Sequence, residues 1–311
     1  MAEKMATREA YGKTLVKMGA VKEDLVVMDA DLSGSTKTGE FKKVYPERFF
    51  NVGIAEQNLY AAAAGLALSG KTVCASTFAM FAAGRAFEII RNSIGYTKAN
   101  VKVCATHAGI TVGEDGASHQ TFEDLALMRT IPGMVVVNPC DGVSAQKLLE
   151  QVIDMQGPAY VRLGRASVPV FYDEDAHLEI GKGHQLKDGK DLTIIATGIM
   201  VNEAMIAAET LEKEDGLSVR VIDMHTIKPL DEEIIIKAAK ETGKIITAEE
   251  HSIIGGLGAA VCEVTAENCP CKVLRVGQLD TYGESGKPEE LKEKYGMNAK
   301  AIVNKVRGDL K

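Results

Sequence analysis

Short runs rich in Val and Ile alternate with longer helix-like stretches along almost the whole chain, and this alternation constrains the fold more than any other feature. The candidate strands are residues 24–30, 49–54, 71–77, 100–106, 133–139 and 159–164, and then 191–198, 217–224, 244–250 and 272–278. Helix-like segments such as AEQNLYAAAAGLAL lie between them. Strands that alternate with helices in this way indicate parallel sheets in an α/β protein.

Residues 165–190 interrupt the alternation. The stretch RASVPVFYDEDAHLEIGKGHQLKDGK contains Pro, Gly and many charged residues, which is typical of a connection between domains, and we expect a small hairpin within it. A chain of 311 residues is long enough for two domains of ordinary size. We therefore predict two parallel-sheet α/β domains, residues 1–170 and 191–311, joined by a linker at 171–190.

Composition and charge exclude several classes of protein. Hydrophobic residues make up 46% of the chain and charged residues 25%, as in a globular enzyme, and the net charge of −7 is spread over both signs. This balance argues against nucleic acid or an anionic membrane as the main partner. No apolar run is long enough to span a membrane, and the first residues do not form a secretory signal.

The six cysteines indicate a reducing compartment. Cys74 and Cys104 lie inside strand-like runs, where a small buried thiol is expected. Cys269 and Cys271 are spaced too tightly for the usual zinc knuckle, and no histidine completes a set. We therefore expect no metal on these thiols and a cytoplasmic location.

Polar and aromatic residues follow the predicted strands of the first domain. In an open parallel sheet, ligands bind outside the carboxyl ends of the strands. Each residue has an ordinary structural explanation when taken alone, such as a turn cap, a charge at a helix N-terminus or a core side chain. Because all of them are expected at the same edge of the predicted sheet, we predict a functional site there. The residues are Asp31, Glu56, Thr77, Phe78, Phe81, His107, Asp115, His119 and Arg165.

The loop AGITVGEDGASHQ, residues 108–120, is the most informative stretch. Its three glycines allow the backbone to approach a ligand closely. His107 just before the loop and Arg165 after the sixth strand can both hold a phosphate group by charge-assisted hydrogen bonds. Arg8 and Ser35 are candidates to join them.

Five motifs in a fixed order carry a resemblance to a known family. GIAEQN, STFAMF, THAGITVGEDGASHQ, PGMVVVNPCD and RLGRAS resemble transketolase, and VIDMHTIKPLD and EEHSIIGGLG resemble its C-terminal domain. The resemblance covers essentially the whole chain. It implies a thiamine-diphosphate pyrimidine-binding domain followed by a transketolase C-terminal domain.

The resemblance extends only to the C-terminal half of a full-length transketolase. The family's N-terminal domain carries a GDG…NN motif that holds Mg²⁺ and the diphosphate of the cofactor, and this sequence contains no such motif. The resemblance therefore implies one subunit of a split transketolase. A separate N-terminal chain would carry GDG…NN and hold the Mg²⁺ or Ca²⁺, and two copies of each chain are the minimal expectation.

For the cofactor, the resemblance assigns roles to residues at the predicted sheet edge. Glu56 would be catalytic and would share a proton with a ring nitrogen of the aminopyrimidine. Phe81, with Phe78 near it, would stack on this ring, and Asp31 would lie beside the thiamine portion. Many transketolases have a tyrosine where this chain has Gly84. The aromatic wall is thinner here, or Arg85 or the partner chain completes it.

For the substrates, the resemblance implies transfer of a two-carbon ketol unit from a ketose phosphate such as xylulose 5-phosphate to an aldose phosphate such as ribose 5-phosphate. His119 would be catalytic at the reacting end of the sugar. Asp115 would contact the hydroxyl next to the acceptor carbonyl. Arg8, Ser35, His107 and Arg165 would hold the sugar phosphate. Many relatives read THD where this chain reads THA, at Ala108.

Three other functions remain open at this stage. The matching half of deoxyxylulose-phosphate synthase shares IAEQ and a GxDGxxHQ loop, but its pattern has Arg where this chain has His107. The beta subunit of 2-oxo acid dehydrogenases has the same two domains without GEDGASHQ. A non-catalytic scaffold is the third alternative, although Glu56 and His119 are both retained.

Overall fold

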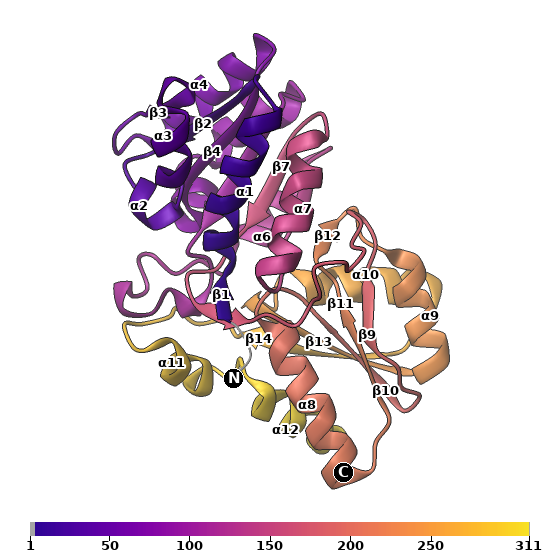
Figure 1. Ribbon diagram of the computed structural model, residues 1–311. Helices are drawn as coiled ribbons and strands as arrows, with labels where there is room; N and C mark the ends of the chain where they lie inside the picture. The colour runs from indigo at the N-terminus through magenta and orange to yellow at the C-terminus, as the bar shows by residue number, and fades with distance from the viewer. Residues whose placement is uncertain (1–3, 311) are drawn as a thin grey trace.

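A computed structural model describes residues 4–310, which form two mainly parallel sheets with helices on both faces (Figure 1). The predicted α/β architecture is confirmed. The first sheet has seven strands within the described residues, and all of its neighbours are parallel except the β12–β6 pair. In spatial order they are β12 (Thr226–Lys228), β6 (Val135–Val137), β7 (Ala159–Arg162), β5 (Val101–Thr106), β4 (Thr72–Phe78), β2 (Leu25–Asp29) and β3 (Phe49–Asn51).

The second sheet is formed by the later part of the chain. Its strands are parallel except for β9 at one edge. In spatial order they are β14 (Lys272–Gln278), β13 (Lys244–Ser252), β10 (Leu192–Ala196), β11 (Val219–Asp223) and β9 (His184–Lys187). The central strands of both sheets are buried along their whole length, because helices cover both faces.

Helices connect the strands in each half. In the first half they are α1 (Thr7–Val21), α2 (Ser33–Thr36), α3 (Gly39–Val44), α4 (Glu56–Leu68), α5 (Phe87–Ile89), α6 (Asp124–Thr130) and α7 (Gly142–Asp154), with short 3₁₀ or π turns η1 (Pro46–Arg48), η2 (Phe81–Arg85), η3 (Ile90–Tyr96) and η4 (Ile110–Asp115). In the second half they are α8 (Met200–Asp215), α9 (Glu232–Thr242), α10 (Leu257–Asn268), α11 (Pro288–Lys294) and α12 (Ala299–Leu310).

The predicted hairpin in residues 165–190 is wrong. The segment contains two short strands, but they do not pair with each other. β8 (Ser167–Pro169) pairs with β1 (Lys4–Ala6), and β9 adds to the edge of the second sheet. A two-stranded hairpin is marginal by itself, so each strand is stabilised better by an edge that other parts of the chain already provide.

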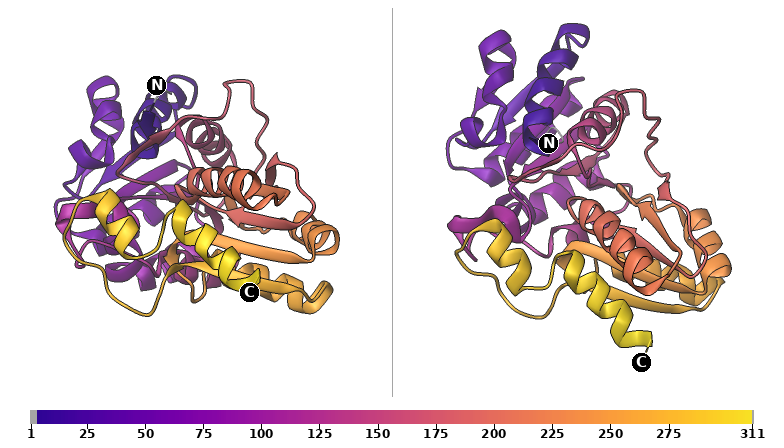
Figure 2. Two further views of the ribbon diagram at one scale, coloured as in Figure 1. Left: turned by 90° about the horizontal axis from the view of Figure 1, so that it is seen from below. Right: turned by 60° about the horizontal axis from the view of Figure 1, so that its bottom comes forward.

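The two halves of the chain interlock. β12 belongs to the later half in sequence, yet it pairs with β6 and extends the first sheet, with Thr226 opposite Val137. The last segment, with α11 and α12, returns along the molecule and places α11 beside η4 of the first half (Figure 2). The later half is therefore built against the loops that follow the strands of the first sheet.

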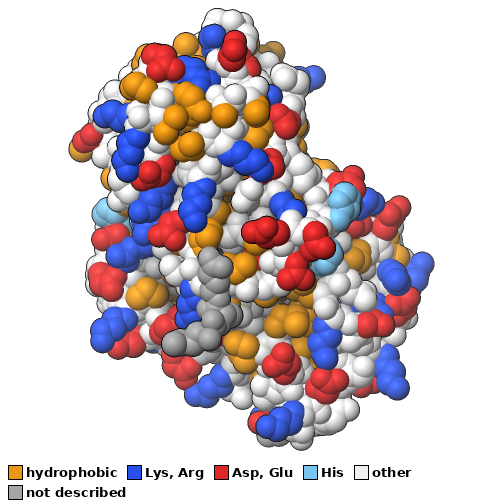
Figure 3. All heavy atoms as spheres, in the orientation of Figure 1, with side chains coloured by type: hydrophobic (Ala, Val, Ile, Leu, Met, Phe, Trp, Pro, Cys, Tyr) orange, Lys and Arg blue, Asp and Glu red, His pale blue; other side chains and the backbone are white. Residues whose placement is uncertain are grey.

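The visible surface shows charges of both signs interspersed over both halves, with no large region of one sign (Figure 3). This agrees with the spread of charge expected from the sequence. Among residues 4–310, no helix combines the length and the apolar character that a membrane crossing requires.

Candidate active site

The carboxyl ends of the first sheet bring aromatic side chains together, as expected. Phe78 is the last residue of β4, and Phe81 opens η2 three residues later. Their rings are stacked with centroids 6.0 Å apart, and the ring of His107 lies 3.9 Å from that of Phe78. The edge of Phe81 meets His119 at 5.3 Å. These four side chains form a continuous wall across the ends of β4 and β5.

Glu56 is the buried carboxylate of this wall. It is the first residue of α4 and only 2% exposed, although it heads a helix whose N-terminus attracts negative charge. Arg85 donates from Nη1 to Oε2 of Glu56 at 3.0 Å, and its guanidinium lies 5.1 Å from the centroid of Phe81. Of the alternatives left open by Gly84, the structure therefore places Arg85 at the end of the aromatic wall.

A second group of residues forms a cationic cluster beside the wall. Arg8 donates from Nη1 to the backbone carbonyl of Ser35 at 2.9 Å, and the same nitrogen lies 3.2 Å from Nε2 of His107. Because arginine can only donate, Nε2 of His107 accepts this hydrogen bond. Nδ1 of His107 lies 2.9 Å from the hydroxyl of Thr106. His107 therefore fixes the position of Arg8 in the structure.

The protonation state of His107 agrees with this geometry. Burial, followed by the positive charges of Arg8 and Arg165, lowers its pKa to about 3. The imidazole is therefore neutral at neutral pH, as an acceptor of a bond from Arg8 must be. His107 also has a positive φ of 58°, which is uncommon outside glycine and is often found where a surrounding site imposes the backbone shape.

Arg165, which follows β7, is the next member of the cationic cluster. Its Nη1 donates to the carbonyl of Val112 and, at 2.8 Å, to Oε2 of Glu114. Burial and the charge of Arg165 lower the pKa of Arg8. The sequence analysis missed Lys37, whose charge also lowers the pKa of His107 and whose φ is 71°. Three cations, Arg8, Arg165 and Lys37, thus lie near enough to His107 to lower its pKa, and among residues 4–310 only Arg165 of the three forms an ion pair with a carboxylate.

Asp31 is exposed and is held from the neighbouring strand. Asn51, the last residue of β3, donates from Nδ2 to Oδ1 of Asp31 at 2.9 Å and accepts from the backbone N–H of Asp31 at 3.0 Å. The φ of Asp31 is 65°. Asn51 was not among the predicted residues, because nothing in its local sequence indicates pairing across strands.

The remaining predicted residues lie on the loop after β5. His119 is half-buried, with its Nδ1 3.0 Å from the hydroxyl of Ser118. Asp115 ends η4 and is exposed, and within residues 4–310 its carboxylate has no hydrogen bond or ion pair with another side chain. The loop therefore presents one imidazole to the aromatic wall and one carboxylate to solvent.

Unpaired polar atoms test which group could lie against the wall. Within the part of the chain that the structure describes, the hydroxyls of Thr77 and Tyr60 are buried without a hydrogen-bond partner. Thr77 and Phe78 are neighbours in β4, so their side chains point to opposite sides of the sheet, and the Thr77 hydroxyl does not face the stacked rings. The fit therefore rests on Glu56, Phe78 and Phe81. A flat, polar aromatic ring with a basic nitrogen, such as an aminopyrimidine, fits a buried carboxylate beside two stacked phenyl rings.

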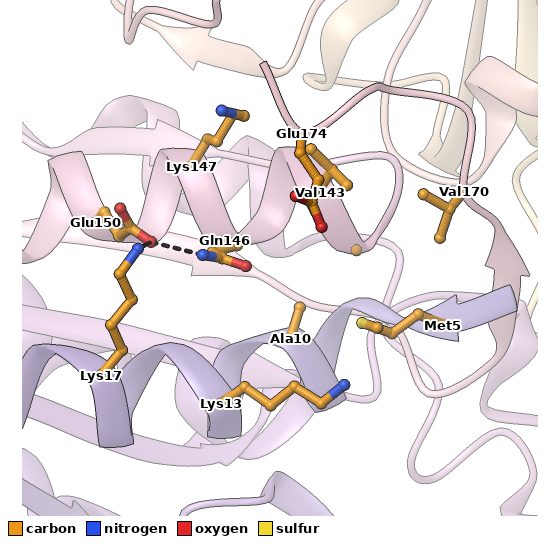
Figure 4. A pocket seen from close by; sticks show the side chains of 11 residues that line it. Met5, Ala10, Lys13, Lys17, Val143, Gln146, Lys147, Glu150, Val170 and Glu174 are labelled. Carbon is orange, nitrogen blue, oxygen red and sulfur yellow. Dashed lines mark hydrogen bonds and ion pairs between the residues drawn. The ribbon is translucent and has the colours of Figure 1, made fainter. Parts of the chain in front are cut away.

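The described residues contain no metal-binding group, and the cavity between α1 and α7 holds none of the predicted site residues. No group of three or more His, Cys, Asp or Glu side chains among residues 4–310 could hold a metal ion. A cavity of about 480 Å³ lies between α1 and α7, where Lys17 and Gln146 both bond to Glu150 (Figure 4). It contains none of the predicted catalytic, cofactor-binding or substrate-binding residues, and its Lys17–Glu150 pair is already neutralised.

Comparison with known proteins identifies both halves of the chain. The family "Transketolase, pyrimidine binding domain" matches residues 3–170, and "Transketolase, C-terminal domain" matches residues 181–302. A putative transketolase C-terminal section from Methanocaldococcus jannaschii is 54% identical over 98% of this chain and 96% of its own length. A 6-deoxy-6-sulfo-D-fructose transketolase subunit from Clostridium sp. (strain MSTE9) is 40% identical over 95% of this chain and 92% of its own.

The solved structures agree with these matches. A "split gene transketolase, inactive beta4 tetramer" superimposes with a TM-score of 0.92, 54% identity and 98% coverage of both chains. Transketolase from Mus musculus is 38% identical over 99% of this chain, which spans 49% of the mouse protein.

Proposed function

Because the chain belongs to the transketolase family, we propose that it is the subunit of a split transketolase that holds the pyrimidine half of thiamine diphosphate and the sugar substrates. The observation that carries this proposal is the buried carboxylate of Glu56 at the end of an aromatic wall, next to a cluster of three cations. The wall fits the cofactor ring, and the cationic cluster fits the anionic end of a sugar phosphate.

The chain's own residues would perform three tasks. Glu56 would hold the proton that the ring nitrogen of the cofactor exchanges, and its position out of water keeps this proton from being lost to solvent. Phe78 and Phe81 would orient the ring by stacking. Bound thiamine diphosphate supplies the nucleophilic carbon for attack on the ketose carbonyl. His119, at the edge of Phe81, would hydrogen-bond to the reacting end of the sugar.

The substrates we propose are a ketose phosphate donor, such as xylulose 5-phosphate, and an aldose phosphate acceptor, such as ribose 5-phosphate. Arg8 and Arg165 would bind the phosphate, and neutral His107 would keep Arg8 in place. Asp115 is free to accept a bond from a sugar hydroxyl near the acceptor carbonyl. The Clostridium relative is named for a sulfonated sugar, which also carries an anionic group.

A separate chain would supply the diphosphate and metal sites, with Mg²⁺ or Ca²⁺ bound there and two copies of each chain in the complex. Two observations support this. The relatives from Methanocaldococcus and Clostridium are themselves covered almost fully by this chain, whereas the mouse enzyme is covered by half. An exposed apolar residue also lies two positions before Glu56, since Ile54 is 78% exposed. All six cysteines are free thiols, which fits the proposed cytoplasmic location.

The experiment that tests this function is a ketol-transfer assay with xylulose 5-phosphate and ribose 5-phosphate in the presence of thiamine diphosphate and Mg²⁺. The chain is assayed alone, and then with a chain from the same genome that carries the GDG…NN motif. We expect transfer only in the mixture. Transfer by this chain alone would contradict the division of the active site, and no transfer by a cofactor-loaded complex would contradict the proposed reaction.

A further inference from the structure

Strand β13 ends in three consecutive buried polar residues, Glu249, Glu250 and His251. Successive side chains of a strand point to opposite sides, so the two carboxylates reach different parts of the molecule. Glu249 stays within its own domain. Its carboxylate accepts from the backbone N–H groups of Leu257 at 2.7 Å and Gly258 at 2.8 Å, in the first turn of α10.

Glu250 reaches into the other half of the molecule. Its Oε1 accepts from the backbone N–H of Thr111 at 2.6 Å, across 139 positions of sequence, and the residue is only 3% exposed. Thr111 lies in η4, on the loop that connects His107 to Asp115 and His119. An interior strand of the second sheet thus contacts the backbone of the loop after β5 in the other half.

The fit between Glu250 and this loop is close. A Cβ atom placed on Gly109 would lie 2.5 Å from Oε1 of Glu250 and 2.6 Å from Oε2, so only glycine leaves room for the carboxylate. Gly109 also has a φ of 81°. Arg162 donates to the backbone carbonyl of Glu250 at 2.9 Å and pairs with buried Asp124. The backbone of Glu250 is therefore held by Arg162, and its carboxylate by the N–H of Thr111.

The same domain contacts the far end of the loop. Gln120 donates from Nε2 to the backbone carbonyl of Glu284 at 2.9 Å. Pro288 at the start of α11 lies against Gly113, where α11 runs beside η4 (Figure 2). The loop that carries the sugar-facing residues is thus supported from behind at its middle and at its end.

We propose that Glu250 is a positioning residue for ketol transfer, because its bond to the N–H of Thr111 fixes the turn that places His107 on one side and Asp115 and His119 on the other. Glu56, Phe78 and Phe81 lie on other elements and do not depend on this bond, whereas His107 and His119 join the wall from the loop. The C-terminal domain then has a defined part in catalysis without touching cofactor or substrate. This inference rests on the proposed function.

The first test compares Glu250→Ala with Glu250→Gln in the reconstituted two-chain enzyme. The alanine variant leaves the N–H of Thr111 without an acceptor, whereas the glutamine side-chain oxygen can still accept. For Glu250→Ala we expect a rise in the KM for the aldose acceptor and a fall in kcat, together roughly tenfold to a hundredfold in kcat/KM, because small displacements of contacting groups have effects of this size. The Kd for thiamine diphosphate should not change, and Glu250→Gln should restore most of the activity.

Glu249→Ala is the matched control. Glu249 is a buried carboxylate one position away, and it bonds only to its own domain. We expect it to lower the Tm without changing the KM for the acceptor. Equal effects of Glu249→Ala and Glu250→Ala on KM, or no effect of Glu250→Ala, would overturn the proposal. If Glu250→Ala does not fold, Glu250→Asp shortens the side chain by one methylene and should raise KM where Glu250→Gln does not.

A measurement on this chain alone separates the inference from the proposed function. Amide hydrogen exchange at residues 109–113 reports the bond to Thr111 whether or not the complex transfers ketol groups. We expect faster exchange there in Glu250→Ala and unchanged exchange in Glu249→Ala. Failure of wild-type turnover together with this exchange pattern would contradict the function only. Unchanged exchange in Glu250→Ala would contradict the positioning role.

Discussion

Arg8 and Arg165 come from opposite ends of the first half of the chain, yet the charge of Arg165 acts on Arg8. Arg8 lies in the first turn of α1, and Arg165 follows β7. The pKa of Arg8 is lowered by burial and by the positive charge of Arg165. The two cations of the cationic cluster therefore repel each other in the absence of a ligand. A bound phosphate would relieve this repulsion and form charge-assisted hydrogen bonds.

This arrangement predicts a loss of affinity that depends on the substrate. Arg8→Met and Arg165→Met should each raise the KM for a phosphorylated ketose about tenfold to a hundredfold, because a hydrogen bond to a charged group contributes roughly 1.5–3 kcal/mol. The KM for a ketose without phosphate should change little. Steady-state kinetics with both sugars provides the measurement, and Lys43→Met on exposed α3 is the control. Equal losses with both sugars would rule out phosphate binding as the role of these arginines.

Among the elements, local pattern predicted where strands end and which residues follow them. Glu56 was expected near a helix start and is the first residue of α4, and Phe78, expected just after a strand at 71–77, is the last residue of β4. The pattern could not predict partners that lie far apart in sequence. Arg85, the last residue of η2, donates to Glu56, which lies 29 positions earlier in the chain. Strand β12 joins the first sheet although its sequence belongs to the second half. Hydrophobic periodicity indicates which side of a helix or strand is buried, but it does not indicate which distant residues that side contacts.

The linker offers a prediction at the level of elements. Asp141 caps α7 by accepting the N–H of Ser144 at 2.8 Å through Oδ1, while its Oδ2 accepts the N–H groups of Phe171 and Tyr172, both at 3.0 Å. Asp141→Asn keeps an oxygen for the cap but places an amide NH₂ before the two other donors. We expect a loss of about 2–4 kcal/mol in unfolding free energy, from two unsatisfied buried donors.

Urea unfolding and limited proteolysis together check this prediction. The variant should be cleaved faster within residues 165–183, because the bonds that hold the linker to α7 are lost. Asp173→Asn, an exposed position in the same segment, should behave as wild type. An Asp141→Asn variant with wild-type stability would show that the cap alone accounts for the role of Asp141.

For the molecule as a whole, buried titratable groups make stability depend on pH in two opposing ways. Burial lowers the pKa of His225 and His251 to about 4 and that of His107 to about 3. Between those values and about 6.5 the unfolded chain binds more protons, so these histidines destabilise the fold as the pH falls. Burial raises the pKa of Asp223 and Glu249 to about 7, so these carboxyls bind protons preferentially in the fold and stabilise it as the pH falls below 7.

Asp223→Asn separates the two contributions. Oδ2 of Asp223 accepts from the thiol of Cys140 at 3.2 Å and from the hydroxyl of Tyr172 at 3.0 Å, and an asparagine oxygen can accept both bonds. The unfolding free energy of the variant minus that of the wild type should be larger at pH 8 than at pH 4.5, by an amount on the order of 2–4 kcal/mol. Urea unfolding across this pH range is the measurement. A constant difference between variant and wild type would mean that Asp223 stays ionised in the fold.

The two interlocked halves place the aromatic wall and the cationic cluster at one edge of the first sheet, and the later half contacts the loop after β5. We propose that the partner chain closes the active site beside Glu56. The central claim is that catalysis at this shared site depends on the proton held by Glu56.

Turnover of the reconstituted complex with Glu56→Gln tests that claim most directly. The variant keeps the size of the side chain and removes its ability to exchange a proton. We predict a loss of about 10²–10⁴-fold in kcat, with the complex assembled and thiamine diphosphate still bound, and with Glu40→Gln on exposed α3 as an active control. Wild-type turnover by a cofactor-loaded Glu56→Gln complex would contradict the account.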